Sequence, residues 1–138
     1  MTLGESIFVD TGAWVALADR DDANHRKAAV AYPTILSSAR RLITTNFIIA
    51  ETYILLLKEL GHDAALSFIE KVKTSPRIER VYSNETLEDE AERLLRKYQD
   101  QDFSYTDAVS FAVMKRTNVK KAFAFDRHFS SAGFIILP

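Results

Sequence analysis

Short apolar segments alternate along this chain with longer segments that carry helix signals, and this alternation limits the possible folds more than any other feature. The apolar segments are too short for core helices and are therefore predicted to be strands. Apolar strands that are each followed by a helix are typical of a parallel sheet with helices on both faces. We therefore predict an α/β fold built as a three-layer sandwich.

The turn and capping signals place the element boundaries. Asn46 is the expected N-cap of the third helix, Pro33 is expected to bend or split the second helix, and Ser104 begins a helix with capping-box spacing. The predicted strands cover residues 6–10, 41–45, 78–82, 121–125 and 134–137. The predicted helices cover residues 12–18, from Asp21 or Asp22 to about 38, 46–60, 62–74 and 85–99, and a last one begins at Ser104.

The overall composition is that of a globular protein. The 138 residues are 47% hydrophobic and 27% charged, and no Gly/Ser-rich linker divides them, so we expect a single domain over residues 1–138. No window approaches the roughly 18–20 uninterrupted apolar residues of a membrane span. The first five residues have no basic start, so we expect no signal peptide. The absence of cysteine excludes disulfides and zinc–thiolate sites. A cytoplasmic protein without membrane contact is the expectation.

The net charge of −1 argues weakly against binding nucleic acid by bulk electrostatics. Net charge is a blunt measure, however, because basic residues can still form a local positive rim around an acidic site. Most of the Lys and Arg residues are expected to be solvated surface charges.

Four widely separated acidic residues lie in apolar or turn-like stretches. Asp10 and Asp126 follow predicted strands, while Asp107 and Glu51 lie in the first and second turns of predicted helices. Sites in open parallel sheets form at the carboxyl ends of the strands, so Asp10 and Asp126 lie side by side if strands one and four are neighbours. A carboxylate beside a core is costly unless it is paired, hydrogen-bonded or bound to metal. Together the four acids predict a site for a divalent cation.

Each acid also has a purely structural interpretation. Asp10 could be a helix N-cap, Asp107 the acid of a capping box, and Asp126 the first residue of a turn. Glu51 is the hardest to explain in this way because apolar residues flank it, although a salt bridge to an arginine would satisfy it. Singly the acids are ambiguous, and only together do they favour a site.

The four acids lie in four short motifs, which are Phe8-Val9-Asp10-Thr11, Thr45-Asn46 with Ala50-Glu51, Ser104-Tyr105-Thr106-Asp107-Ala108, and Phe125-Asp126-Arg127-His128-Phe129. These motifs resemble those of PIN-domain nucleases, and most closely those of the VapC-type toxins of toxin–antitoxin pairs. The resemblance covers essentially the whole chain. It implies a five-stranded parallel sheet in the order 3-2-1-4-5 and a Mg²⁺- or Mn²⁺-dependent endoribonuclease acting on RNA. It further implies a homodimer that is inhibited by a cognate antitoxin.

The chemistry expected of these acids is metal-assisted hydrolysis of a phosphodiester bond. Asp10, Glu51 and Asp107 are expected to hold a first ion, directly or through water, and Asp126 to complete the site or help to hold a second. Thr11 and Thr106 adjoin proposed ligands and could orient a carboxylate or a water molecule. Ordinary helix-start hydroxyls are the alternative interpretation of these two threonines.

No other catalytic arrangement competes with the acids. The sequence has no phosphate loop, and the three histidines, His25, His62 and His128, are scattered without metal-ligand spacing. The alternative function is a catalytically inactive PIN-like module that binds RNA or protein, with its acids acting as caps or as a structural ion site. The sequence does not specify which RNA would be cleaved.

Two apolar surfaces are predicted to contact partners. The helix over 46–60 is apolar around more of its circumference than one core-facing stripe requires, which favours a dimer. The next helix, 62–74, could instead cover the excess. Trp14, Val15 and Leu17, close to Asp10, are candidates for a groove that accepts an antitoxin segment.

Overall fold

The computed structural model describes residues 4–138 and contains a five-stranded parallel sheet. Its order, β3-β2-β1-β4-β5, is the predicted one. β1 pairs with both β2 and β4 and is therefore the central strand. Its carboxyl end lies in the middle of the edge formed by the carboxyl ends of the strands. The strands are β1 (Ile7–Val9), β2 (Leu42–Thr45), β3 (Ile78–Val81), β4 (Lys121–Phe123) and β5 (Ile135–Leu137).

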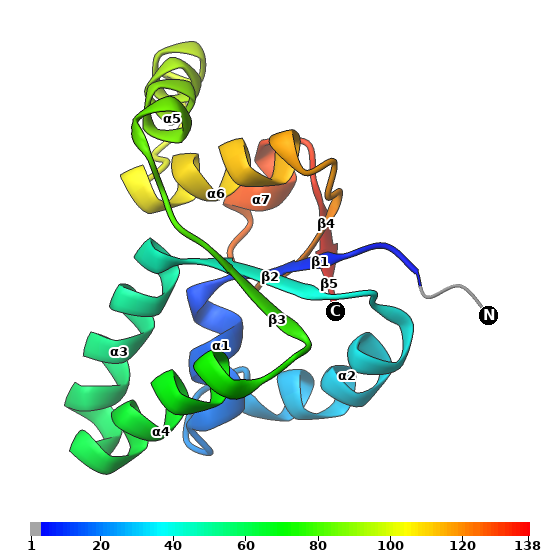
Figure 1. Cartoon of the computed structure of the whole chain (residues 1–138), viewed down its shortest axis with the longest axis vertical. Helices are drawn as coiled ribbons and strands as arrows, with labels where there is room; N and C mark the ends of the chain where they lie inside the picture. The colour runs from blue at the N-terminus through cyan, green and yellow to red at the C-terminus, as the bar shows by residue number, and fades with distance from the viewer. Residues whose placement is uncertain (1–3) are drawn as a thin grey trace.

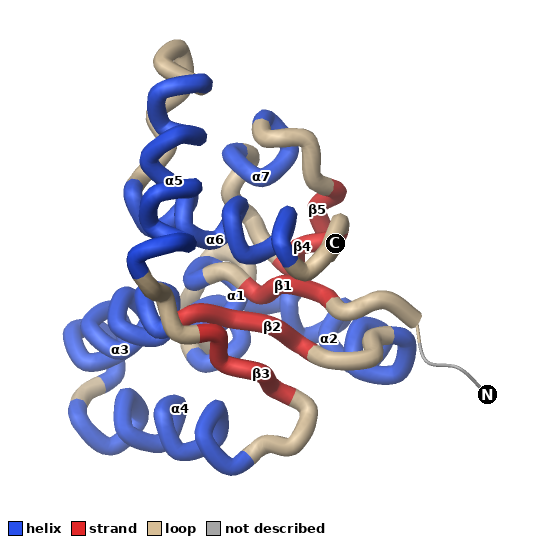
Figure 2. The backbone as a smooth tube through the Cα atoms, turned by 45° about the horizontal axis from the view of Figure 1, so that its top comes forward, coloured by secondary structure: helices blue, strands red, loops and turns tan. Residues whose placement is uncertain are grey.

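Helices occupy both faces of this sheet, and Figure 1 shows the three layers. The first four helices lie on one face, whereas the sixth and seventh lie on the other with the fifth packed outside them. The tube of Figure 2 shows the same division from a tilted view. The helices are α1 (Thr11–Ala18), α2 (His25–Ser38), α3 (Asn46–Leu60), α4 (His62–Thr74), α5 (Glu85–Lys97), α6 (Tyr105–Arg116) and α7 (His128–Ser131).

Large side chains join the layers. On one face Phe8 of β1 packs on Phe129 of α7, which contacts Phe111 of α6 edge-on at 5.0 Å between ring centroids. On the other face Trp14 of α1 contacts Phe68 of α4 at 5.6 Å. All residues of β1 and β2 are buried, as expected for strands covered on both sides. The core therefore holds the carboxyl ends of β1 and β2 rigidly.

The second helix begins later than predicted, because Asn24 rather than Asp21 or Asp22 is its N-cap residue and His25 is its first residue. Acidic side chains explain the difference, because they accept hydrogen bonds from nearby amides and so stabilise a turn before the helix. Asp19 accepts from the amide of Asp21, and Asp22 accepts from the amide of Asn24. Pro33 lies inside α2 and does not split it.

The predicted N-cap of α3 is wrong by one residue. The hydroxyl of Thr45 accepts a hydrogen bond from the amide of Ile48 at 3.1 Å and caps the helix. Asn46 is instead the first helical residue, and its side-chain oxygen Oδ1 accepts a hydrogen bond from the backbone amide of Ser83 at 2.8 Å. This bond ties the start of α3 to the end of β3. The helix ends at Gly61, as predicted, where φ of +95° favours glycine.

No helix within residues 4–138 is long and apolar enough to cross a membrane. The expectation that the N-terminus carries no signal peptide falls partly on residues 1–3, which lie outside the described residues.

Candidate active site

The carboxyl ends of β1 and β4 lie side by side. The two strands pair through Val9 and Phe123, and the amide of Asp10 donates to the carbonyl of Phe123 at 3.1 Å. Asp10 therefore leaves the sheet next to the segment that leads from β4 to Asp126. Asp10 and Asp126 were predicted to lie side by side if strands one and four are neighbours. The structure meets that condition, because β1 pairs with β4.

Asp10 is the most perturbed of the four acids. It precedes α1 and is only 7% exposed, and its side chain accepts no capping bond from the first turn of that helix. Burial raises the pKa of its carboxyl from 3.8 to about 7. The backbone amide of Thr11 opposes this rise, whereas the negative charges of Asp107, Asp126 and Glu51 add to it. The other three carboxylates therefore lie close enough to Asp10 for their charges to act on it.

Glu51 is fixed by α1. The hydroxyl of Thr11 donates to Oε1 of Glu51 at 3.0 Å, which links the start of α1 to the second turn of α3. The glutamate is half-buried, and within residues 4–138 it forms no ion pair with an arginine. Among its apolar neighbours, Ile48 and Ile49 are buried, whereas Ile54 and Leu55 are exposed. The carboxylate of Glu51 lies close enough to Asp10 for its charge to raise the pKa of that acid.

Asp107 is held by a complete capping box. The amide of Asp107 donates to the hydroxyl of Ser104, and the amide of Ser104 donates to Oδ2 of Asp107, both at 3.0 Å. The phenol of Tyr105 donates to Glu92 of α5 at 3.0 Å, so the first turn of α6 is also anchored from outside. The capping interpretation is correct, and the cap places the carboxylate at the edge of the sheet.

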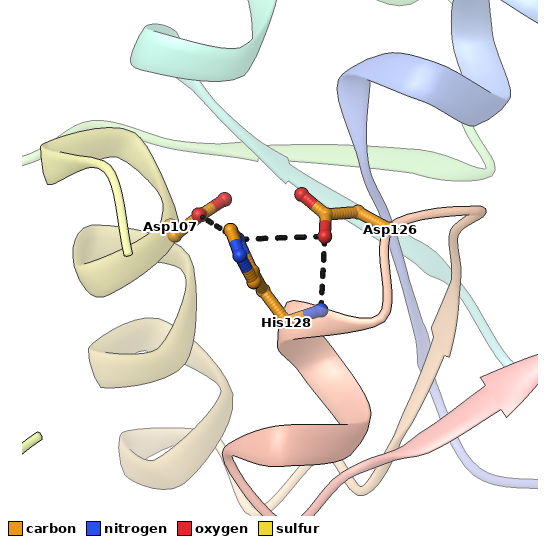
Figure 3. Close-up of side chains that lie close together, drawn as sticks. All are labelled: Asp107, Asp126 and His128. Atoms are coloured by element: carbon orange, nitrogen blue, oxygen red, sulfur yellow. Dashed lines mark hydrogen bonds and ion pairs between the residues drawn. The ribbon is translucent and has the colours of Figure 1, made fainter. Parts of the chain in front are cut away.

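Asp126 begins a turn and accepts a hydrogen bond from the amide of His128 at 2.9 Å on Oδ1. The imidazole of His128 lies between two of the acids, as Figure 3 shows. Its Nδ1 is 3.0 Å from Oδ2 of Asp107 and 3.4 Å from Oδ1 of Asp126. His128 was not among the predicted site residues, because the three histidines show no metal-ligand spacing along the chain. The adjacency to Asp126 was the available signal.

Within residues 4–138, a tight group of ligand-type atoms comes from Asp107, Asp126 and His128, which each offer an atom within 4.8 Å of the others. This differs from the predicted first-ion set of Asp10, Glu51 and Asp107. Asp10 and Glu51 are not members of this group, but the charges of Asp107, Asp126 and Glu51 all act on Asp10.

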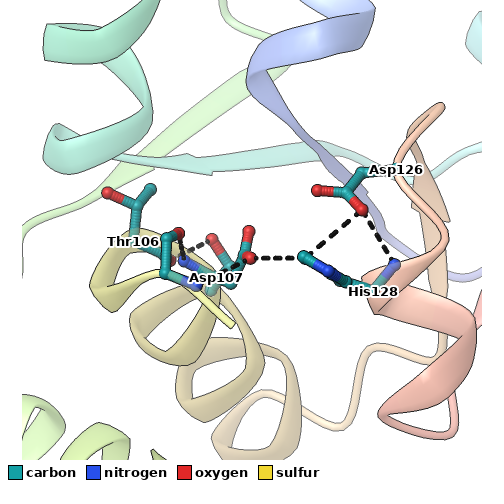
Figure 4. A network of polar contacts seen from close by, with 6 residues as sticks. Thr106, Asp107, Asp126 and His128 are labelled. Carbon is teal, nitrogen blue, oxygen red and sulfur yellow. Dashed lines mark hydrogen bonds and ion pairs between the residues drawn. The ribbon is translucent and has the colours of Figure 1, made fainter. Parts of the chain in front are cut away.

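The hydroxyls of the two predicted supporting threonines behave differently. Thr11 orients Glu51, as described above. The hydroxyl of Thr106 makes no hydrogen bond to an acid among the described residues, and in Figure 4 it points away from the carboxylate of Asp107. The contact made by Thr106 is through its backbone carbonyl, which accepts from the hydroxyl of Ser110 at 2.9 Å.

The comparison with protein families agrees with this geometry. The PIN domain model matches residues 7–135, which include all four acids, strands β1 to β4 and the first residue of β5. The chain belongs to the PIN-domain family. The predicted resemblance is confirmed.

Known PIN-domain relatives carry VapC names. The chain is 37% identical over 130 residues to the 23S rRNA-specific endonuclease VapC20 of Mycobacterium tuberculosis, covering 94% of this chain and 95% of the relative. It is 29% identical over 126 residues to ribonuclease VapC26 of the same organism, covering 91% and 90%. The crystal structure of VapC20, described as a sarcin–ricin loop cleaving toxin, superposes with a TM-score of 0.87 at 33% identity and covers 96% of this chain and 99% of that one.

A more distant structure supports the fold alone. VapBC2 of Rickettsia felis, bound to a DNA fragment from its promoter, matches with a TM-score of 0.69 at 10% identity, covering 95% and 96% of the two chains.

Proposed function

We propose that this PIN domain is a metal-dependent endoribonuclease that hydrolyses RNA phosphodiester bonds, and that it is the toxin of a toxin–antitoxin pair. The observation that carries the proposal is the convergence of four carboxylates from four separate segments on one edge of the sheet. The buried carboxyl of Asp10, whose pKa burial raises to about 7, marks the centre of the negative charge.

The donor set fits a hard divalent cation such as Mg²⁺ or Mn²⁺. Oxygen atoms of carboxylates are the ligands that these ions prefer, and no cysteine is present to favour a softer metal. In the apo protein the carboxylates repel one another, and a cation would relieve that repulsion. We assign Asp10, Glu51, Asp107 and Asp126 as the groups that hold it.

Three of these acids, Glu51, Asp107 and Asp126, each keep one carboxylate oxygen available to bind a cation. Oδ2 of Asp107, Oδ1 of Asp126 and Oε1 of Glu51 accept hydrogen bonds from the protein. The second oxygen of each accepts none from another described residue. Each side chain can therefore be fixed by one oxygen and bind through the other.

A bound divalent cation would neutralise the phosphate and lower the pKa of a water molecule. The residues of the chain would position these groups. Thr11 keeps Glu51 turned toward the acids, and the capping box does the same for Asp107. Asp10 is buried, so little bulk water would reach its carboxylate.

The relatives suggest where to look for the substrate. VapC20 is named for activity on 23S ribosomal RNA. We propose RNA as the substrate class and ribosomal RNA as its first candidate. Because such a substrate is found inside the cell, the proposal also places the protein in the cytoplasm.

The test is an RNA cleavage assay with purified protein. Ribosomal RNA is incubated with the chain in the presence of Mg²⁺ or Mn²⁺, and in parallel with EDTA. Cleavage at discrete positions that requires the metal is expected, and Asp10→Asn and Asp107→Asn should each remove it. Asp89→Asn, an exposed substitution on α5, is the matched control. Metal-independent cleavage, or equal activity in Asp10→Asn, contradicts the proposal, and no cleavage of any RNA supports the inactive-module alternative.

An antitoxin segment has a surface available to it. A groove of about 670 Å³ lies between α1, α4 and β3, lined by Trp14 and Leu17 together with Leu60, Phe68 and Ile78. Of the candidate groove residues, Val15 is not part of this lining. The same helix that presents Trp14 and Leu17 begins beside Asp10, so a peptide in the groove could extend an arginine toward the acids. Co-expression with the neighbouring gene should relieve growth arrest, and Leu17→Asp should prevent that relief while leaving RNA cleavage intact.

The proposed homodimer is supported by apolar side chains that α4 does not cover. Ile54 and Leu55 of α3 are 45% and 41% exposed, and Leu60 and Leu66 are similarly exposed nearby. A single copy therefore leaves part of the apolar surface of α3 in water. Sedimentation of the purified chain should give a dimer mass, and Ile54→Lys should give a monomer. A wild-type mass that remains monomeric at all concentrations removes this part of the proposal.

A further inference from the structure

His128 contacts both acids of the tight group through different atoms. Its imidazole Nδ1 is within hydrogen-bonding distance of Asp107, and its backbone amide donates to Asp126. The ring of Phe103 stands edge-on to the imidazole, with 5.3 Å between the centroids. Phe103 is itself buried and packs on Phe111 of α6, so the orientation of the imidazole is set by the core.

The hydrogen on Nδ1 follows from the partner. An ionised carboxylate only accepts hydrogen bonds, so the contact at 3.0 Å requires Nδ1 to donate to Oδ2 of Asp107. The same oxygen already accepts from the amide of Ser104. Two donors therefore converge on Oδ2, and Oδ1 receives none from another described residue.

Without the imidazole, the Asp107 carboxylate would keep only the hydrogen bond from the amide of Ser104. Rotation about its last side-chain torsion would then be weakly restrained. The torsion about the carboxylate of an aspartate is broad and roughly two-fold, so a single hydrogen bond restrains it poorly. The second donor, which comes from α7 on the opposite side of the cluster, restricts that rotation. It also joins α6 to the turn that carries Asp126 (Figure 4).

We propose that His128 is a positioning residue of the cation site, which donates from Nδ1 to Oδ2 of Asp107 and so presents Oδ1 to the metal. The inference rests on the proposed metal-dependent nuclease function. The alternative role for His128 is direct coordination of the cation by Nδ1. The two roles exclude each other, because an Nδ1 that carries a hydrogen has no lone pair for a metal.

Three substitutions separate these roles. His128→Asn places an amide donor near the position of Nδ1, whereas His128→Leu removes the donor and keeps an apolar side chain against Phe103. His128→Gln carries its amide farther out, away from Nδ1. His62→Leu, at an exposed histidine that begins α4, is the matched control.

The primary measurement is Mn²⁺ affinity by electron paramagnetic resonance titration of the purified full chain without RNA. Loss of a hydrogen-bonding partner behind a metal ligand typically weakens affinity about 10–100-fold, which is the expected result for His128→Leu. His128→Asn should retain wild-type affinity within about threefold if the donor is what matters. The pulsed resonance spectrum of bound Mn²⁺ should show no coupling to a directly coordinated nitrogen.

The outcomes that overturn the inference are distinct from those that overturn the proposed function. Wild-type affinity in His128→Leu shows that the imidazole does not position Asp107. A strong nitrogen coupling in the wild type, with equal loss in His128→Asn and His128→Leu, assigns the histidine as a ligand. Absence of Mn²⁺ binding by the wild type contradicts the metal-dependent function itself. If His128→Leu is unfolded by circular dichroism, the comparison of His128→Asn with His128→Gln decides, because only the first restores the donor.

Discussion

Replacement of Asp10 by asparagine should stabilise the metal-free protein at neutral and alkaline pH. The carboxyl is 7% exposed, and burial followed by the charges of neighbouring acids raises its pKa from 3.8 to about 7. The rise corresponds to about 4 kcal/mol between the protonation states, since each pKa unit is about 1.4 kcal/mol. Asparagine keeps the size of the side chain and removes the charge.

The pH window follows from the direction of the pKa change. Below about pH 4 the carboxyl is protonated in both the folded and unfolded chain, so it does not affect the free energy of unfolding. Between pH 4 and pH 7 the unfolded chain ionises while folded Asp10 stays protonated, so the stability of the wild type falls as pH rises. Above pH 7 the carboxyl is ionised in both states, so the folded protein bears the full free-energy cost of the buried charge. The advantage of Asp10→Asn should therefore grow from near zero at pH 4 to about 2–4 kcal/mol at pH 8, the lower figure allowing for a weaker hydrogen bond from Thr11.

Urea unfolding in EDTA, at several pH values between 4 and 8, measures this difference directly. The expected gain at pH 8 corresponds to a rise in Tm of roughly 5–15 °C for a chain of this size. Addition of Mg²⁺ at ten times its Kd should stabilise the wild type by about 1.4 kcal/mol and leave Asp10→Asn nearly unchanged. Asp89→Asn, exposed on α5, should show neither effect. A variant less stable than the wild type at pH 8, or a difference that does not change with pH, would refute the reasoning.

Other substitutions test the supports of the site and the backbone. Thr11→Val removes the hydrogen bond to Glu51 and should lower nuclease activity about tenfold, whereas Thr11→Ser should restore it in the same assay. Ser104→Ala removes the N-cap of α6 and should cost about 1 kcal/mol in thermal or urea unfolding, with a measurable loss of Mn²⁺ affinity. Gly61→Ala should destabilise by about 1–2 kcal/mol because φ is +95°. Gly12→Ala should stabilise by up to about 1 kcal/mol, because it lies in a helix with no atom within 4 Å of the added carbon.

The strands of the sheet were predictable because the segments are short and rich in apolar residues, and the central pair, β1 and β2, is buried along its whole length. The order 3-2-1-4-5 came from the family resemblance, and the structure confirms it. Boundaries were less accurate where side chains compete with the backbone. Asp19 and Asp22 delay the start of α2, and Thr45 rather than Asn46 caps α3 because its hydroxyl reaches the amide of Ile48. Such choices depend on local hydrogen bonds whose geometry the pattern of apolar residues does not specify.

The convergence of the acids was predictable from strand ends and helix starts, but the role of His128 was not. A histidine that approaches an aspartate 21 residues away leaves no regular spacing in the sequence. Its placement depends on the rotation of α7 against α6, which the ring of Phe103 fixes from a third segment. Three-dimensional packing therefore supplied the information that spacing lacked.

The structural and functional interpretations of the acids turn out to be compatible. Asp107 is a capping-box acid and Asp126 is a turn residue, yet each uses only one carboxylate oxygen to accept these local hydrogen bonds. The local bond fixes the carboxylate at a helix start or a strand end, where the topology of a parallel sheet brings such positions together. The second oxygen is then free to face the other acids without further restraint. A capping interaction at these positions is therefore no argument against a metal site, since the cap is what holds the ligand in place.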